Sequence, residues 1–243
     1  MRILLLLVLS GCGGAVGRGS AAIATGDLPV ATQILEDAAA GGQASGAVWF
    51  DLGTAWYLRG DLPRAVACWR HAARLRPRDA DVQHDLALAR SQLPGTPPPS
   101  LGPVWARLAT PGELGIVGAL VAAAGSALAL RWRRSRGSDG TLAATLVAVG
   151  VFLGILGTIS DVHGRAHPTA VVLDAEIRAR SMPQADAPER FRLPAGSEVR
   201  VERDSDDWIL VSDGRARRGW VSASALAIVA AGERAPTVEP AAR

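Results

Sequence analysis

A tetrapeptide that occurs twice, 34 residues apart, constrains the fold of this chain more than any other feature. Gly-Asp-Leu-Pro stands at 26–29 and again at 60–63. In each copy the Asp is suited to cap a helix and the Pro to occupy its first turn. A period of 34 residues is typical of repeats built from two helices joined by a turn. The sequence therefore predicts an array of helix pairs over residues 12–93.

The residues around the second copy follow the signature of a tetratricopeptide repeat, which this region resembles. The matching residues are Trp49, Leu52, Gly53, Trp56, Ala65, Trp69, Ala72 and Pro77. On the first helix Trp49, Leu52 and Trp56 share one face, which predicts core positions. Gly53 allows the second helix to pack closely, and we expect Trp69 to fill the gap between the helices.

The array is predicted to be short, with about two repeats and a charged capping helix at 79–93. Arrays of this kind present a concave groove that binds peptides. The polar residues Asp51, Thr54 and Arg59 are the candidate groove residues. The aromatic residues of the signature are predicted to be core between the helices and not groove contacts.

The first residues have the pattern of a secretion signal. Arg2 precedes an apolar run at 3–9 that is too short to cross a membrane of about 30 Å. The following Leu-Ser-Gly-Cys at 9–12 resembles the lipobox of bacterial lipoproteins. That resemblance implies a signal peptide at 1–11 and a lipid on Cys12. The alternative is an ordinary secretory signal that is cleaved elsewhere.

Two uncharged runs in the middle of the chain are predicted to be transmembrane helices, at 114–130 and 141–160. The Arg-rich loop between them, at 131–140, is predicted to be cytoplasmic by the positive-inside rule. A Pro-rich linker at 94–113 and a short one at 161–169 flank the runs. We therefore expect two spans in a bacterial inner membrane, with both soluble regions on the extracytoplasmic side.

The two runs lack ionisable residues, which argues against an ion pore or a transporter. Small residues recur every four positions, from Gly118 in the first run and from Gly150 in the second. Such rows allow two helices to approach closely, although Ala-rich runs also contain them by chance.

Residues 170–230 contain six short strand-like runs separated by turns, followed by a flexible tail at 231–243. The runs are at 170–173, 176–180, 198–203, 208–211, 219–221 and 226–229. The landmarks Gly196, Trp208, Gly219 and Trp220 resemble those of a bacterial SH3-like domain. The resemblance implies a small β-barrel in which Gly196 makes a hairpin turn and the two Trp residues cap or fill the interior. Binding of cell-wall peptide and binding of a protein partner both remain open for this region.

Charge and motifs exclude several functions. The chain has 26 basic and 23 acidic residues, a net charge of +3, and the excess lies in residues 101–160. Neither soluble region is a basic patch, so we expect no nucleic acid partner. The motifs of nucleotide-binding loops, nucleophile elbows and zinc proteases are absent. We therefore expect no catalytic residue, no cofactor and no metal site, and a protein that is not an enzyme.

The order of signal, tetratricopeptide repeats, two spans and SH3-like domain resembles the BatE proteins of bacterial aerotolerance operons. The fold class expected is a multidomain membrane protein with an all-α repeat region, a two-helix transmembrane hairpin and an all-β SH3-like small barrel. The resemblance implies an envelope complex with von Willebrand-type membrane proteins and a MoxR-type ATPase. The expected function is a membrane-anchored scaffold for protein partners; the alternative is peptidoglycan binding or sensing through the SH3-like domain. We expect the two soluble regions to fold independently.

The lipobox leads to a direct test. Growth with a radiolabelled fatty acid is expected to label the protein in an acid-resistant form, because the lipid is attached to the mature N-terminus. Cys12→Ala removes the thiol and is expected to abolish the label. Label retained in that variant would contradict lipidation at Cys12.

Overall fold

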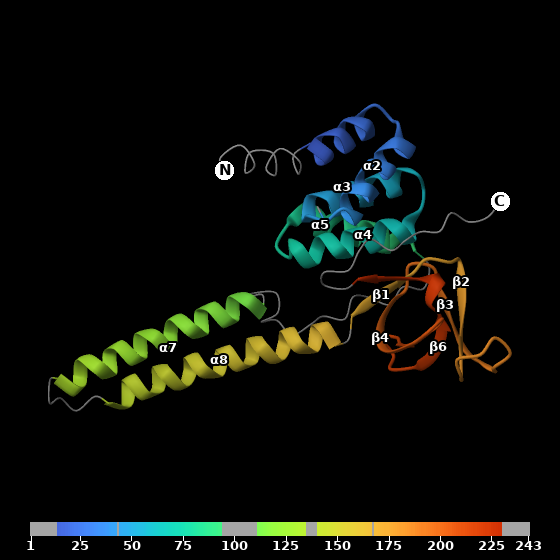
Figure 1. The fold of residues 1–243 in the computed structure, drawn as a ribbon. Coiled ribbons are helices and arrows are strands. Elements are labelled where there is room, and N and C mark those ends of the chain that lie inside the picture. The colour runs from blue at the N-terminus through green and yellow to red at the C-terminus, as the bar shows by residue number, and fades with distance from the viewer. Residues whose placement is uncertain (1–13, 43, 94–110, 135–139, 167, 230–243) are drawn as a thin grey trace. The chain divides into compact units, whose positions relative to one another are not determined.

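The computed structural model describes residues 14–42, 44–93, 111–134, 140–166 and 168–229. It combines α-helices with a seven-stranded antiparallel sheet, which confirms a mixed helix and sheet class (Figure 1). The described residues fall into two compact units. The first contains the N-terminal helices and the sheet, and the second contains two long helices. The predicted signal peptide, Cys12, most of the linker at 94–113 and the tail at 231–243 lie outside the described residues.

The N-terminal region consists of consecutive short helices. They are a helix at 14–24, α2 (Leu28–Ala40), α3 (Gly46–Leu58), α4 (Leu62–Leu75) and α5 (Ala80–Gln92). The repeated tetrapeptide opens α2 and α4 in the same way. Asp27 and Asp61 each accept a hydrogen bond at the helix N-terminus, from the backbone N–H three residues on. Gly26 and Gly60 have φ of 80° and 82°. The sequence repeat is therefore also a repeat in backbone geometry.

The predicted core residues of the helical region are buried. Trp49, Leu52, Trp56, Ala65, Trp69 and Ala72 are each at most 8% exposed. Gly53 faces the indole of Trp69, where an added Cβ would lie 2.5 Å from Cδ1. The indole Nε1 donates a hydrogen bond of 3.1 Å to the carbonyl of Phe50. Pro77 lies in the turn that follows α4. This close approach fixes the packing of α3 on α4.

The sheet has the strand order β3-β2-β6-β5-β4-β1-β7, and all pairs are antiparallel. The strands are β1 (Thr169–Val172), β2 (Glu176–Arg180), β3 (Glu189–Pro194), β4 (Glu198–Ser205), β5 (Trp208–Ser212), β6 (Arg218–Ser222) and β7 (Leu226–Val229). Gly196, with φ of 72°, lies in the turn between β3 and β4. These two strands do not pair with each other, so the prediction that this turn closes a hairpin is wrong. Strand β3 is not among the predicted runs. Its two inward residues, Phe191 and Leu193, stand among charged ones.

The two Trp residues of the sheet do not fill its core. Trp208 and Trp220 alternate with the buried residues Ile209 and Val221, so both indoles lie half-buried on the outer face. The prediction that they fill the interior is therefore wrong, and the prediction that they cap it stays a prediction. The core consists of aliphatic residues and Phe191, and Gly219 is close-packed within it because an added Cβ would lie 2.8 Å from the Cβ of Ala179.

The second unit is a pair of antiparallel helices, α7 (Pro111–Arg134) and α8 (Gly140–Ala166) (Figure 1). Their small residues meet at the contact. A Cβ on Gly118 would lie 2.7 Å from the carbonyl oxygen of Gly150, and a Cβ on Gly150 would lie 2.5 Å from the amide nitrogen of Ala122. The rows of small residues are thus used for close helix packing.

The prediction of two membrane spans is wrong. In the described residues only Glu113–Leu130 of α7, 18 residues with a mean hydropathy of 1.9, is long and apolar enough to cross a membrane. The apolar stretch of α8, Ala143–Ile159, is shorter. At 1.5 Å per residue it rises about 25 Å, less than a hydrocarbon core of about 30 Å. The inner-membrane topology with both soluble regions outside the cytoplasm depended on two spans and is withdrawn with them.

The helical region and the sheet are also less separate than the sequence suggests. They belong to one compact unit, and α4 packs against β1 and β7. Val171, Ala227 and Val229 of the sheet join the same buried cluster as the helical residues. The expectation that the two regions fold independently assumed no contact between them, and that assumption is wrong.

The packing of Gly53 against Trp69 gives a stability prediction. Gly53→Ala is expected to lower the free energy of unfolding by about 1–3 kcal/mol, because the added methyl group overpacks a rigid indole. Gly17→Ala is the matched control, since its added Cβ meets nothing within 4 Å in the helix at 14–24. That control is expected to be neutral or stabilising by up to about 1 kcal/mol. Urea unfolding of the full chain followed by circular dichroism measures both, and equal effects would contradict the packing.

Candidate functional site

The three predicted groove residues make contacts within the helical region. Asp51 accepts a hydrogen bond of 2.6 Å from the hydroxyl of Ser20. Arg59 Nη1 donates one of 2.8 Å to Oγ1 of Thr32. Thr54 donates to a carbonyl of its own helix at 3.1 Å. Asp51 and Arg59 therefore join α3 to the two helices before it, and their role in a groove stays a prediction.

Two exposed leucines near these residues were not singled out from the sequence. Leu58 on α3 is 52% exposed and Leu88 on α5 is 41% exposed. Leu58 lies four residues after Thr54 and seven after Asp51, which places the three on one helix face. The adjacent Tyr57 accepts a hydrogen bond of 3.0 Å at its hydroxyl from Nε2 of Gln92, which connects α3 to α5. The signal in the sequence that could have identified Leu58 was its spacing of four and seven residues from the polar groove candidates on the same helix.

Two guanidinium groups lie over the ring of Trp56. The Cζ atoms of Arg59 and Arg64 are 4.4 Å and 4.8 Å from its ring centre. Burial raises the pKa of Glu36 near these arginines, whose charges oppose that shift. Burial also raises the pKa of the Cys68 thiol strongly. A fully protonated, buried thiol is a poor nucleophile, so this cysteine serves packing.

A carboxylate joins the helical region to the sheet. Oε2 of Glu198, at the start of β4, lies 2.7 Å from Nη2 of Arg70 on α4. Nε of Arg90 on α5 donates a hydrogen bond of 2.7 Å to Oε1 of the same carboxylate. Since all three side chains are partly buried, the contact is stronger than an exposed ion pair of the same geometry.

Helix α4 also covers β7, which is an edge strand of the sheet. Arg74 Nη1 donates a hydrogen bond of 2.6 Å to the carbonyl of Val229. The same helix places the buried ring of His71 close to the backbone of Ile228. Unpaired carbonyls of an edge strand would otherwise be open to pairing with another chain. These side chains therefore protect the edge.

His71 is buried and stacked. It is 6% exposed, and its ring lies 4.2 Å from that of Trp49 with an angle of 13° between the planes. Burial lowers the pKa of His71 to about 4, against the opposing effect of its hydrogen bond to Ile228, and the charge of Arg74 lowers it further. His71 is therefore neutral at pH 7.

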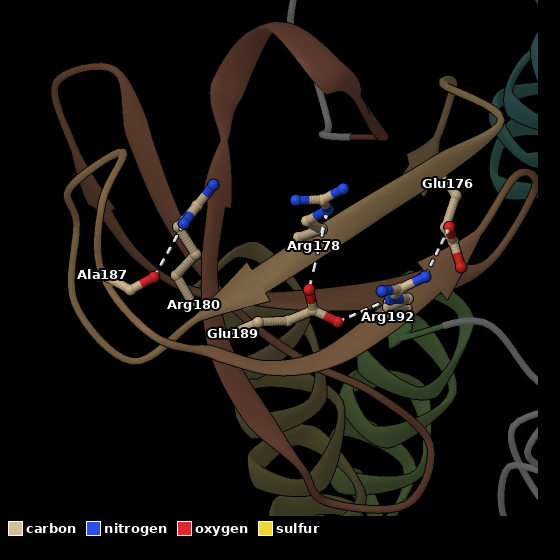
Figure 2. A network of polar contacts seen from close by, with 6 residues as sticks. All are labelled: Glu176, Arg178, Arg180, Ala187, Glu189 and Arg192. Carbon is tan, nitrogen blue, oxygen red and sulfur yellow. Dashed lines mark hydrogen bonds and ion pairs between the residues drawn. The ribbon is translucent and has the colours of Figure 1, made fainter.

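The outer face of β2 and β3 carries an ordered network of charges (Figure 2). Arg178 and Arg192 stand directly opposite each other in the strand pairing, which alone would be repulsive. Glu189 lies 3.8 Å from Arg178 and 2.7 Å from Arg192, and Glu176 lies 3.4 Å from Arg192 (Figure 2). At the end of the strand Arg180 donates to the carbonyl of Ala187 at 2.8 Å (Figure 2). The network neutralises the pair and puts charge on the edge strand β3.

No group of three or more His, Cys, Asp or Glu side chains in the described part of the chain is placed to hold a metal ion. No protein-family model matches this chain, and no curated protein matches it. The function must therefore be argued from the chain's own surfaces.

The buried histidine predicts a pH dependence of stability. The pKa of His71 is about 4 in the folded state and 6.5 when unfolded, so between these values the unfolded chain binds the proton first. Its contribution to the free energy of unfolding is therefore constant above pH 6.5 and falls by about 3 kcal/mol as the pH drops towards 4.

His71→Phe keeps a ring against Trp49 and removes the titrating group. Urea unfolding of both full-length proteins at pH 7 and pH 4.5 is expected to show a smaller loss of stability in the variant. An equal loss in the two proteins would contradict the burial of a neutral imidazole.

Proposed function

We propose that this chain is a non-enzymatic scaffold that binds partner proteins through its helical region. The observation that carries the proposal is the repeat: in two helix pairs, 34 residues apart, the second helix begins with the same capped turn. A duplicated helix pair with an added helix supports a short tetratricopeptide array, and such arrays present extended binding surfaces. We also propose that the C-terminal sheet is an SH3-like small barrel, which its seven short antiparallel strands and the turn at Gly196 support.

The partner surface is proposed to include Leu58 and Leu88. They are large apolar side chains that remain about half exposed on helices α3 and α5. Asp51 and Thr54 lie on the same face of α3 as Leu58, so the apolar contact has polar neighbours. An apolar centre with a polar rim is the usual composition of a protein interface.

An apolar exterior supports membrane association of the α7–α8 pair. Leu120 on α7 and Phe152 on α8 are each 65% exposed, and Ile116 is 63% exposed. Contiguous exposed apolar surface of this kind marks contact with lipid or with another protein. Helix α7, with its one candidate span, is the proposed anchor.

The family that this arrangement resembles gives the proposal its biological setting. Capped helical repeats, apolar helices and a C-terminal sheet in this order support membership of the BatE proteins of aerotolerance operons. The partners would then be von Willebrand-type membrane proteins and a MoxR-type ATPase in an envelope-stress complex.

A second candidate is binding of cell-wall peptidoglycan by the sheet region. The specific observation in its favour is the position of Trp208 and Trp220, which are half-buried on the outer face. Leu210 stands opposite Trp220 in the strand pairing and two residues after Trp208 on β5. Indole rings at a partly exposed surface combine apolar area with a hydrogen-bond donor, which suits contact with a ligand.

Site-specific photo-crosslinking tests the scaffold proposal. A photoreactive residue at position 58 or 88 of the full chain is expected to form adducts with a partner in the cells that produce it. Position 75 is the matched control, because Leu75 is a leucine on α4 with 55% exposure. Leu58→Asp is expected to weaken partner binding about tenfold, the effect of losing one well-placed apolar contact. Equal adducts at all three positions would contradict a partner surface on α3 and α5.

Purified cell walls separate the two candidates. The scaffold proposal expects no retention of the full chain by sacculi. Retention that Trp220→Ala abolishes and Leu58→Asp leaves unchanged would favour the peptidoglycan candidate instead.

A further inference from the structure

An open cavity of ≈ 380 Å³ lies beside the β5–β6 turn, and three of its five lining residues are arginines. It is lined by Arg190, Phe191, Ala216, Arg217 and Arg218. Neither the helical region nor the network of Figure 2 supplies a lining residue. The cavity is therefore separate from the surfaces considered above.

The turn that forms one wall is held by a single aspartate. Asp213 accepts hydrogen bonds of 2.9 Å from the backbone N–H groups of Arg215 and Arg217. Its second carboxylate oxygen accepts one of 2.8 Å from Nε of Arg217. Ala216 has φ of 58°, a left-handed conformation that is uncommon for a residue with a Cβ. The turn is thus built in a defined shape.

The guanidinium of Arg217 is held over an aromatic ring. Its Cζ lies 4.5 Å from the ring centre of Phe191, which is itself almost fully buried in the sheet core. A guanidinium stacked flat on a ring keeps its N–H edges available in the plane. Phe191 and Ala216 also give the cavity an apolar wall.

The charges around the cavity do not cancel. Arg217 is paired with Asp213 at 2.7 Å, and Arg218 with Glu202 at 3.1 Å. Arg190 donates a hydrogen bond of 3.2 Å to the carbonyl of Arg218, and it has no ion pair with any residue that the structure describes. One positive charge and several N–H donors therefore face the open space.

We propose that this cavity binds the oxyanion of a small organic molecule, a carboxylate or a phosphate group. Both groups match the planar fork of arginine with two parallel hydrogen bonds. The volume exceeds that of a bare oxyanion and lies within the range of about 300–1,000 Å³ that is usual for small-molecule sites. The remaining space beside Phe191 and Ala216 accommodates the apolar part of the ligand. This site goes beyond the proposed scaffold function and does not depend on it.

Arginine footprinting of the full chain tests the proposal. Phenylglyoxal modification is mapped by mass spectrometry with phosphate, with acetate, or with chloride at the same ionic strength. At ten times the dissociation constant, either oxyanion is expected to reduce modification of Arg190 and Arg217 about tenfold, because about a tenth of the sites remain free. Arg192 is the internal control, since it is 53% exposed on the same strand. Its modification is expected to be unchanged.

The variant Arg190→Gln removes the unpaired charge from an exposed position and is expected to abolish the protection of Arg217. Circular dichroism confirms that the variant is folded. Protection by acetate alone identifies a carboxylate ligand, and protection by phosphate alone identifies a phosphoryl group. Protection that chloride reproduces, that extends to Arg192, or that persists in Arg190→Gln would overturn the proposal.

Discussion

The contact of Glu198 with Arg70 and Arg90 is the interaction on which the first unit depends. It joins two helices near the start of the chain to a strand more than a hundred residues later. Removing one partner of a partly buried ion pair leaves a charge without compensation, which costs more than the pair contributes when intact. In the sequence, the α7–α8 pair is an insertion between α5 and β1, because the residues before it and after it belong to the same unit. An antiparallel pair suits that position because it returns the chain towards its start.

The two edges of the sheet are protected in different ways. At β7 the helical region supplies covering residues, and Arg74 donates a hydrogen bond to the strand's backbone. At β3 there is no covering helix in the described residues, and Arg192 and Glu189 place charge on the outer face instead. The helical region thus has a structural role towards the sheet, apart from any partner that it binds.

The sequence predicted local features well and long-range ones poorly. Capped turns such as that at Asp61 and the core position of Trp69 follow from nearby residues, so the repeat was visible. The junction at Glu198 leaves no local pattern, because its partners lie on other elements. Phe191 and Leu193 of β3 alternate with charged residues, as in a half-buried strand, but the run is short and lies between two prolines, which obscured the pattern. The half-buried position of Trp220 depends on strand register, which the sequence does not determine. Arg190 lines the same cavity as Arg217 only because the fold brings the β5–β6 turn next to β3.

The chain contains no lysine, and this has structural consequences. All 26 basic residues are arginines. A guanidinium can stack flat on a ring and donate in its plane at the same time, which an ammonium group cannot do. Arg59 and Arg64 use the first property on the ring of Trp56, and Arg90 uses the second on Glu198. Arg217 uses both, since it stacks on Phe191 and pairs with Asp213. Replacing these residues by lysine would keep the charge and lose the planar donor group. The packing of this protein therefore depends on the planar geometry of the guanidinium as much as on its charge.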